Sequence, residues 1–265
     1  MKPAPFSYAA PHTVEAALAL LEDEDARVLA GGQSLVPMMN FRLARPVKLV
    51  DINRIGELAH LRRSDGALRC GALTRHAALE RSALVAAHWP LLRQAVVHVA
   101  HPPVRARGTI GGTCAHADAT AELPVALTAL DAVFHARSRA SARAIPASEF
   151  FLDHFTTALE PGELLVEVEV PPLPAGARTG FAEHALTHGD WAIAGAAVVV
   201  APGHAAIALL GAGATPVRAG EAEAALVAGE GAGRAAELAA ALVEDPWRAA
   251  VTAALVRRAL AEAGA

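Results

Sequence analysis

The chain has 265 residues, of which 54% are hydrophobic and 19% are charged, and its formal net charge at pH 7 is −4. This length and apolar content predict an ordered protein with a well-buried core and argue against intrinsic disorder. No basic block stands out, which argues against nucleic acid as a partner.

Two apolar segments resemble targeting or membrane signals only at first sight. Residues 1–21 hold one lysine and three early prolines and lack the apolar stretch of a signal peptide. Residues 191–214 form the longest apolar tract, but Ala-Pro-Gly-His at 201–204 interrupts it and predicts a turn between two buried strands. We therefore expect a cytoplasmic protein without a transmembrane segment.

The residues that commonly bind metals are few and scattered. The two cysteines, Cys70 and Cys114, lie far apart in the sequence. An iron–sulfur cluster normally needs four thiolates, so this chain does not hold one by itself. His98 and His101 could share a helix face, but no nearby carboxylate or thiolate completes a site. We predict no metal site.

The first 73 residues predict a small α/β unit followed by a hairpin. Thr13 is a good N-cap for a helix over 14–24. Strands are predicted at 27–30 and 47–52, and the unit closes around Asn53. The hairpin covers residues 61–73, with Asp65-Gly66 as its turn.

The middle of the chain mixes short helices and strands. Its predicted helices cover 75–81, 90–99 and 121–131, and His-Pro-Pro-Val at 101–104 ends the second of them. Its predicted strands cover 132–137, 142–146 and 163–171. The last strand alternates apolar and acidic residues, which indicates one wet face.

The segment 171–180 is the best candidate boundary because it is dense in proline and glycine. Beyond it, three strands are predicted at 181–186, 193–200 and 204–210. Three helices follow, at 217–227, 234–243 and 247–263. Asp245-Pro246 supplies an N-cap and an N1 proline for the last helix.

Two segments share a pair of glycines between apolar flanks: "LAGGQSLVP" at 29–37 and "GTIGGTCAHADATAELP" at 108–124. Glycine lets a ligand approach the peptide groups, and successive N–H groups there can form an anion-binding nest. Gln33, Ser34, Thr109 and Thr113 add side-chain donors, so the two segments could face one diphosphate. The alternative is that each pair is only a tight turn. The chain contains neither a P-loop nor a G-x-G-x-x-G fingerprint.

These two segments carry a family resemblance. Residues 30–55 and 104–132 resemble the FAD-binding medium subunit of molybdenum hydroxylases, the group of xanthine dehydrogenase and aerobic carbon monoxide dehydrogenase. Residues 1–21, 150–171 and 189–200 fit the same pattern. The resemblance therefore covers almost the whole chain.

The resemblance implies an α+β fold with two parts. Residues 1–175 are expected to form a two-lobed FAD-binding domain of the vanillyl-alcohol-oxidase (PCMH) type, with lobes at about 1–55 and 56–175. Residues 176–265 are expected to form a C-terminal domain of the CO dehydrogenase flavoprotein type, a small antiparallel sheet with a helical bundle.

The resemblance also assigns residues to the cofactor site. The diphosphate is expected to rest on two backbone segments, formed by Ala30, Gly31, Gly32, Gln33, Ser34 and Leu35, and by Thr109, Ile110, Gly111, Gly112 and Thr113.

Three further positions complete the expected site. Glu122 occupies a position that usually carries an aspartate near the ribose or adenine end. Leu165 matches an apolar residue beside the flavin, and Trp191 matches an often aromatic residue against one isoalloxazine face. From pattern alone, Glu122 also suits a helix N-terminus and Trp191 a core or interface position.

The sequence departs from the family pattern around the second segment. Ala106 stands where asparagine is usual, and Thr113 where asparagine or serine is common. Ala119 replaces a usual proline, and Glu122 replaces aspartate. These changes affect the adenine end and leave both glycine pairs intact.

The implied function is electron transfer through non-covalently bound FAD, with no catalytic side chain in this chain. Electrons would come from [2Fe-2S] clusters of a small partner subunit, pass to FAD and leave to an external acceptor. A large subunit would carry molybdopterin, and the assembly is expected to be a dimer of heterotrimers. Two alternatives stay open: a structural subunit that has lost FAD, and a free-standing flavin oxidoreductase.

Overall fold

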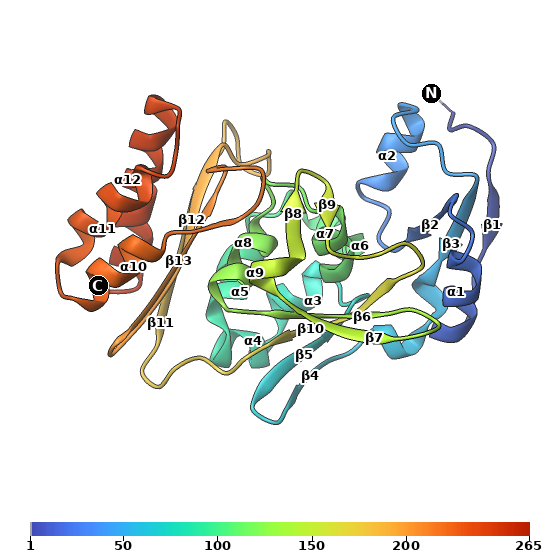
Figure 1. Ribbon diagram of the computed structural model, residues 1–265, viewed down its shortest axis with the longest axis horizontal. Helices are drawn as coiled ribbons and strands as arrows, with labels where there is room; N and C mark the ends of the chain where they lie inside the picture. Colours follow the sequence, from blue (N-terminus) through green and yellow to red (C-terminus); the bar gives the residue numbers. More distant parts are fainter. Residues whose placement is uncertain (1) are drawn as a thin grey trace.

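The computed structural model describes residues 2–265. The chain forms a small N-terminal sheet, a larger central sheet, and a third sheet covered by the C-terminal helices (Figure 1). The two termini lie at opposite ends of the molecule.

The N-terminal lobe is a three-stranded parallel sheet in the order β1-β3-β2. The elements of the lobe in chain order are β1 (Ser7–Ala9), α1 (Val14–Leu21), β2 (Ala26–Leu29), α2 (Leu35–Asn40) and β3 (Lys48–Asp51), followed by the 3-10 turns η1 (Ile52–Arg54) and η2 (Gly56–Leu58). As predicted, Thr13 caps α1: its hydroxyl accepts the Ala16 N–H at 3.2 Å. The apolar face of α1 packs on the sheet to form a small core.

The central sheet has five antiparallel strands in the order β4-β5-β10-β6-β7. Their bounds are β4 (Leu61–Ser64), β5 (Ala67–Gly71), β10 (Leu164–Val170), β6 (Val133–Arg137) and β7 (Ala142–Pro146). The predicted turn is confirmed, because Asp65 and Gly66 both have positive φ, at 53° and 85°.

Short helices carry the chain between β5 and β6. They are α3 (His76–Arg81), α4 (Ala83–His88), α5 (Pro90–Val96), α6 (Pro102–Arg107), α7 (Ile110–His116) and α8 (Glu122–Ala129). After β7, the chain adds α9 (Ala147–Phe150) and a hairpin of β8 (Phe151–Asp153) and β9 (Thr156–Thr157). Buried residues of these helices and of the central strands form the largest core.

The third sheet is antiparallel, in the order β11-β12-β13-β14. It comprises β11 (Arg178–His184), β12 (Ala194–Ala201), β13 (His204–Leu210) and β14 (Val217–Arg218), and α10 (Gly220–Val227), α11 (Gly231–Ala240) and α12 (Pro246–Glu262) follow it. One face packs into the central core and the other packs on these helices. Burial on both faces explains the long apolar tract at 191–214.

The sequence expectations differ from the structure in several short elements. Helices α2, α4, α6, α7 and α9 and strands β1, β8 and β9 were not predicted. The helix predicted over 217–227 begins only at Gly220 because Val217–Arg218 pairs with β13 as β14. Pro102 ends no helix; it is the N1 residue of α6, where its missing N–H costs nothing. The expected boundary near residue 175 lies between β10 and β11, and the division into two domains stays a prediction.

Candidate functional site

The first glycine segment joins β2 to α2. Gly32 has φ of 72°, in the left-handed region that favours glycine. Among the described residues, the amide N–H groups from Gly31 to Leu35 find no acceptor. Successive free N–H groups of this kind can hold an anion. The segment therefore offers main-chain donors to a ligand.

Two side chains, Asn53 and Arg75, fix the main chain of this segment through hydrogen bonds. Asn53 donates through Nδ2 to the carbonyl oxygen of Ala30 at 2.7 Å. Arg75 donates to Asn53 Oδ1 at 2.7 Å and to the carbonyl oxygen of Arg107 at 2.5 Å. One guanidinium thus connects both glycine segments. Sequence reasoning named Asn53 only as the point where the N-terminal unit closes, and it did not identify Arg75.

The second glycine segment is the first turn of α7, a helix that was not predicted from the sequence. Thr109 is the N-cap of α7, and its hydroxyl accepts the Gly112 N–H at 3.1 Å. The N–H groups of Ile110, Gly111 and Thr113 donate to main-chain carbonyls. Because these donors are already used, the second segment differs from the first in what it can offer a ligand.

The glycines bring the two segments together. A Cβ at Gly31 would collide with the carbonyl oxygen of Arg107, so only glycine lets these main chains touch. A Cβ at Gly111 would lie 2.6 Å from the Cβ of Ala72. Gly112 faces Ala30, whose Cβ is 3.9 Å from the position that a Cβ would take. Two of the four glycines are therefore needed for packing.

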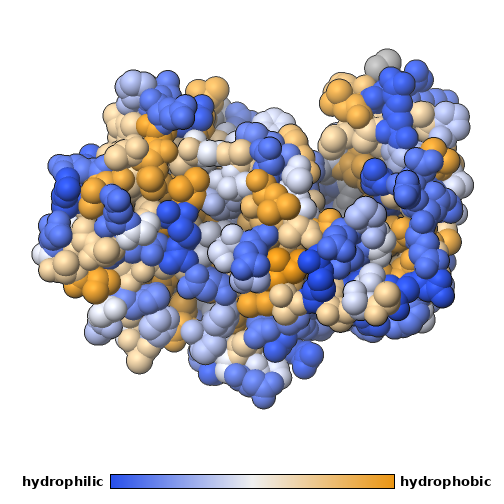
Figure 2. Space-filling view, in the orientation of Figure 1, coloured by the Kyte–Doolittle hydropathy of each residue, from blue (hydrophilic) through white to orange (hydrophobic). Residues whose placement is uncertain are grey.

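The surface is hollowed between the lobe that carries α2 and the centre of the molecule (Figure 2). Gln33 and Ser34 are exposed, and neither side chain is used in the fold beyond one weak bond from Gln33 Nε2 to Gly31 O at 3.2 Å. Exposed polar side chains beside free amides suit an anionic ligand.

The second segment rests on a buried histidine. His76 is 3% exposed, and its Nε2 lies 3.0 Å from the Thr113 hydroxyl. Burial lowers the pKa of His76 to about 4, so the ring is neutral at physiological pH. His76 was not identified from the sequence, because a lone histidine at the start of a helix gives no signal there.

The arginines before the second segment have different roles. Arg105 is 7% exposed, pairs with Glu80 at 2.9 Å and donates to the carbonyls of Val99 and Ala100. It therefore holds the loop after α5. Arg107 is exposed, and only its main-chain carbonyl takes part in the contact with Arg75 and Gly31.

The three outlying predicted residues are placed differently from one another. Glu122 opens α8 and is 7% exposed, and burial raises the pKa of its carboxyl to about 8. Leu165 is 3% exposed and lies at a bulge of β10, within the central core. Trp191 is 78% exposed, in the loop between β11 and β12. Trp191 is thus not a core tryptophan.

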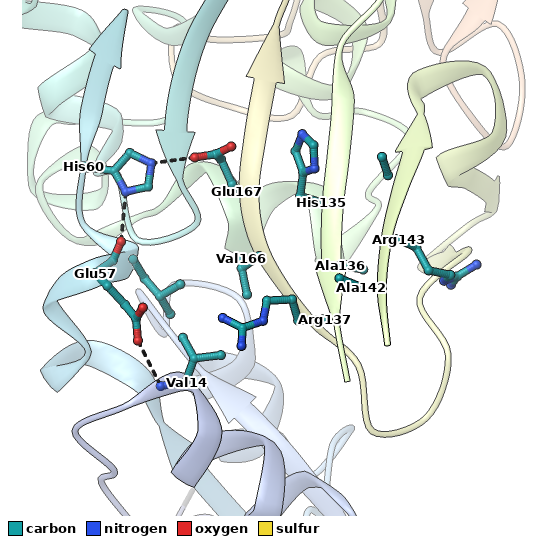
Figure 3. A pocket seen from close by; sticks show the side chains of 12 residues that line it. Val14, Glu57, His60, His135, Ala136, Arg137, Ala142, Arg143, Val166 and Glu167 are labelled. Carbon is teal, nitrogen blue, oxygen red and sulfur yellow. Dashed lines mark hydrogen bonds and ion pairs between the residues drawn. The ribbon is translucent and has the colours of Figure 1, made fainter. Parts of the chain in front are cut away.

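A cavity of about 430 Å³ lies elsewhere, between α1 and the open face of the central sheet (Figure 3). His60 bridges the carbonyl of Glu57 at 2.9 Å and the carboxylate of Glu167 at 2.8 Å. Arg137 and Arg143 pair with Glu15 and Glu163. The charged groups at this cavity already have partners, and the glycine segments do not line it.

Residues 2–265 contain no group of three or more His, Cys, Asp and Glu side chains able to hold a metal ion. No helix in this range is long and apolar enough to cross a membrane.

Comparison with known proteins gives the same architecture. Residues 4–173 match the family model described as the FAD binding domain in molybdopterin dehydrogenase. The chain is 50% identical over 226 residues to the 6-hydroxypseudooxynicotine dehydrogenase complex subunit alpha of Paenarthrobacter nicotinovorans, covering 82% of this chain and 76% of that protein. It is 44% identical over 204 residues to the carbon monoxide dehydrogenase medium chain of Hydrogenophaga pseudoflava, covering 76% and 70%.

Solved structures match over the whole chain. The TM-score is 0.95, at 39% identity, to a carbon monoxide dehydrogenase from Hydrogenophaga pseudoflava that lacks the Mo-pyranopterin moiety of its cofactor, covering 100% of this chain and 99% of that one. It is 0.93, at 37% identity and the same coverage, to quinoline 2-oxidoreductase from Pseudomonas putida 86.

The family model and the solved structures define the chain as an FAD-binding subunit of an oxidoreductase. The chain belongs to the family of FAD-binding domains of molybdopterin dehydrogenases, so the resemblance, the fold class and FAD as cofactor are confirmed. The free amides from Gly31 to Leu35 fit the diphosphate of that cofactor.

Proposed function

We propose that this chain is the FAD-carrying electron-transfer subunit of a molybdenum hydroxylase. When bound, FAD supplies one- and two-electron chemistry that no amino-acid side chain offers. Electrons would arrive from [2Fe-2S] clusters of a small partner subunit and leave to an external acceptor. The family membership and the free amides from Gly31 to Leu35 support this proposal.

The chain's own residues would bind and orient FAD. The amides of the first segment would donate to the diphosphate, and the exposed side chains of Gln33 and Ser34 would add polar groups beside them. The second segment, from Thr109 to Thr113, would contribute chiefly the Thr113 hydroxyl and a close backbone surface, because its amides are used internally.

Leu165, Trp191 and Glu122 stay proposals as FAD contacts. A tryptophan that is 78% exposed in the isolated chain is free to lie against an isoalloxazine ring. Leu165 belongs to the central core and would act through packing. Glu122 would meet the nucleoside part.

Partner subunits are the second part of the proposal. Large apolar side chains are exposed on three separate loops: Phe41 and Leu43 after α2, Leu152 and Phe155 on the β8–β9 hairpin, and Leu186 and Trp191 between β11 and β12. Exposed apolar groups of this size suit subunit contacts. A large molybdopterin subunit, a dimer of heterotrimers and a cytoplasmic location complete the proposal.

A glycine double variant tests the site. Gly32→Val with Gly112→Val places side chains at a left-handed backbone position and against the Thr109 hydroxyl, 2.7 Å from the added Cβ. The control is Gly56→Val with Gly220→Val, where an added Cβ meets nothing within 4 Å. The proposal predicts loss of FAD from the first variant only. Equal FAD retention in both, with unchanged melting temperatures, would contradict it.

Metal analysis of the purified complex tests the partners. Iron and molybdenum should co-purify with the tagged full chain from its native host. FAD with neither metal would instead support the free-standing flavin oxidoreductase. Both metals without FAD would support the structural subunit.

A further inference from the structure

Asp51 lies at the C-terminal end of β3, next to the start of the first glycine segment. The parallel register places Asp51 opposite Leu29, the last residue of β2, and Ala30 follows directly in the chain. Because the two strands are parallel, their C-terminal ends lie at the same edge of the sheet. A side chain at the end of β3 therefore reaches the segment that leaves β2.

The Asp51 carboxylate receives hydrogen bonds on both of its oxygens. Its Oδ1 accepts from the main-chain N–H of Asn53 at 2.9 Å and from Asn53 Nδ2 at 2.6 Å. Its Oδ2 accepts from the Tyr8 hydroxyl at 2.5 Å. Burial acts to raise the pKa of Asp51, but the hydrogen bonds from Tyr8 and Asn53 outweigh it and hold the pKa below its ordinary value. Asp51 is therefore ionised at neutral pH and acts only as an acceptor.

The amide of Asn53 is held in one orientation by its three partners. Its Nδ2 donates to Asp51 Oδ1 and, at 2.7 Å, to the carbonyl oxygen of Ala30. Its Oδ1 accepts from the Arg75 guanidinium at 2.7 Å. A flipped amide would set its oxygen against two acceptors and its NH2 group against a cation. Asp51 and Arg75 thus select the orientation in which Asn53 binds Ala30.

Tyr8, on β1, is the outer end of this series of hydrogen bonds. The residue is 56% exposed, so its hydroxyl bond rather than burial of its ring connects it to the lobe. The hydrogen bond to Asp51 raises the pKa of Tyr8, which keeps the phenol protonated and able to donate. The series therefore runs from the surface of the N-terminal lobe to the first glycine segment.

We propose that Asp51 and Tyr8 are positioning residues for the FAD site. Asp51 orients the Asn53 amide, and Tyr8 orients the Asp51 carboxylate. Through the Ala30 carbonyl they hold the free amides from Gly31 to Leu35 in the arrangement that receives the diphosphate. This inference rests on the proposed FAD site, and neither side chain needs to touch the ligand.

Flavin fluorescence titration of the full chain with FAD tests this role. Tyr8→Phe removes one hydroxyl group and should weaken FAD binding about 3- to 10-fold. Asp51→Ala removes the charged acceptor of Asn53 and should weaken it about 10- to 100-fold. Tyr8→Phe alters an exposed side chain and keeps the test valid if Asp51→Ala does not fold.

Two matched controls lie on the same lobe. Ser7→Ala removes the neighbouring hydroxyl of β1, which donates to the carbonyl oxygen of Val47 at 3.2 Å. Asp23→Asn weakens an exposed ion pair with Lys48, at 2.6 Å, on the same strand as Asp51. Neither group belongs to the series of hydrogen bonds, so both variants should bind FAD as the wild type does.

Conservative replacement and a double-mutant cycle separate positioning from stability. In Asp51→Asn the side-chain oxygen still accepts from Asn53, and its NH2 group can donate to the Tyr8 phenol oxygen. Its FAD affinity should recover to within about 3-fold of the wild-type value. In the Asn53→Ala background the series is already broken, so Tyr8→Phe should cause no further loss of affinity.

The proposal and the function on which it rests fail in different ways. Wild-type FAD affinity in Tyr8→Phe and Asp51→Ala, with lowered unfolding midpoints, would overturn the positioning role alone. Fully additive losses from Tyr8→Phe and Asn53→Ala would overturn it as well. A wild-type chain and complex that bind no FAD would overturn the proposed function and, with it, this inference.

Discussion

Gly31 and Arg107 touch main chain to main chain, and this contact fixes the distance between the two glycine segments. A Cβ at Gly31 would strike the Arg107 carbonyl oxygen, which Arg75 already holds at 2.5 Å. The Arg107 carbonyl cannot move away from Gly31 without straining that bond. A residue without a Cβ at position 31 is thus required by the fold as well as by the proposed ligand.

Gly31→Ala should therefore destabilise the chain, by about 1–3 kcal/mol, as overpacking does. It should also lower FAD retention, because the segment must shift. Urea unfolding and flavin content measure the two effects. Gly56→Ala is the matched control, since nothing lies within 4 Å of its added Cβ. An unchanged unfolding midpoint for Gly31→Ala would show that the Gly31 and Arg107 main chains can separate without cost.

Asn53 links the first segment to Arg75, so Asn53→Ala should act on both. It leaves the Ala30 carbonyl and one Arg75 N–H without partners. We expect a loss of about 1–2 kcal/mol in unfolding free energy and weaker FAD binding. Isothermal titration with FAD and denaturant unfolding would check this. Full FAD affinity in Asn53→Ala would mean that the free amides hold their geometry unaided.

Arg105 is a buried cation whose partners depend on it. Replacement by methionine leaves Glu80 without its ion-pair partner and leaves carbonyls of the 97–100 loop without their donor. We expect a loss of about 3–5 kcal/mol. The double variant Arg105→Met with Glu80→Met should recover part of it, and a lack of recovery would place the cost in the carbonyls rather than in the pair.

Glu122 should make the chain less stable as pH rises. The folded state keeps this proton up to a pKa of about 8, whereas the unfolded chain releases it near 4.5. The folded state therefore binds more protons between these values, and unfolding free energy falls by up to about 1.4 kcal/mol per pH unit from this group. Glu122→Gln should remove that fall, as urea unfolding across the interval would show. The same slope in wild type and variant would mean that Glu122 ionises normally.

Trp191 is exposed, so Trp191→Ala should cost less than about 0.5 kcal/mol of stability. If it covers the flavin, its loss should nevertheless raise the fluorescence of bound FAD, because indole contact quenches flavin emission. Trp247→Ala, at a tryptophan that is 56% exposed on α12, is the control. Equal flavin emission from both variants would remove Trp191 from the site.

Much of the fold was predictable from local patterns. The hairpin turn at Asp65-Gly66, the Thr13 cap and the Asp245-Pro246 start each rest on a few adjacent residues, and the structure has all three. Helices α2, α4 and α6 have only six residues each, too few for a periodic signal. Their stability comes from packing, which local sequence does not report.

The candidate site was predictable as a pair of segments but not as a structure. The glycine pairs indicated close backbone approach, yet the sequence did not show that Gly31 meets Arg107 and Gly111 meets Ala72. Arg75 and His76 act across long sequence separations, and the chain has many such residues. Their roles depend on which strands and helices meet.

The most direct test of the central claim is the flavin content of the native complex, purified through this chain and desalted. The account predicts an oxidised-flavin absorption spectrum, stoichiometric FAD released on denaturation, and loss of both in the Gly32→Val, Gly112→Val variant. A complex that retains its partner subunits and their metals yet holds no FAD would contradict the account, and would show that this chain serves only as a scaffold.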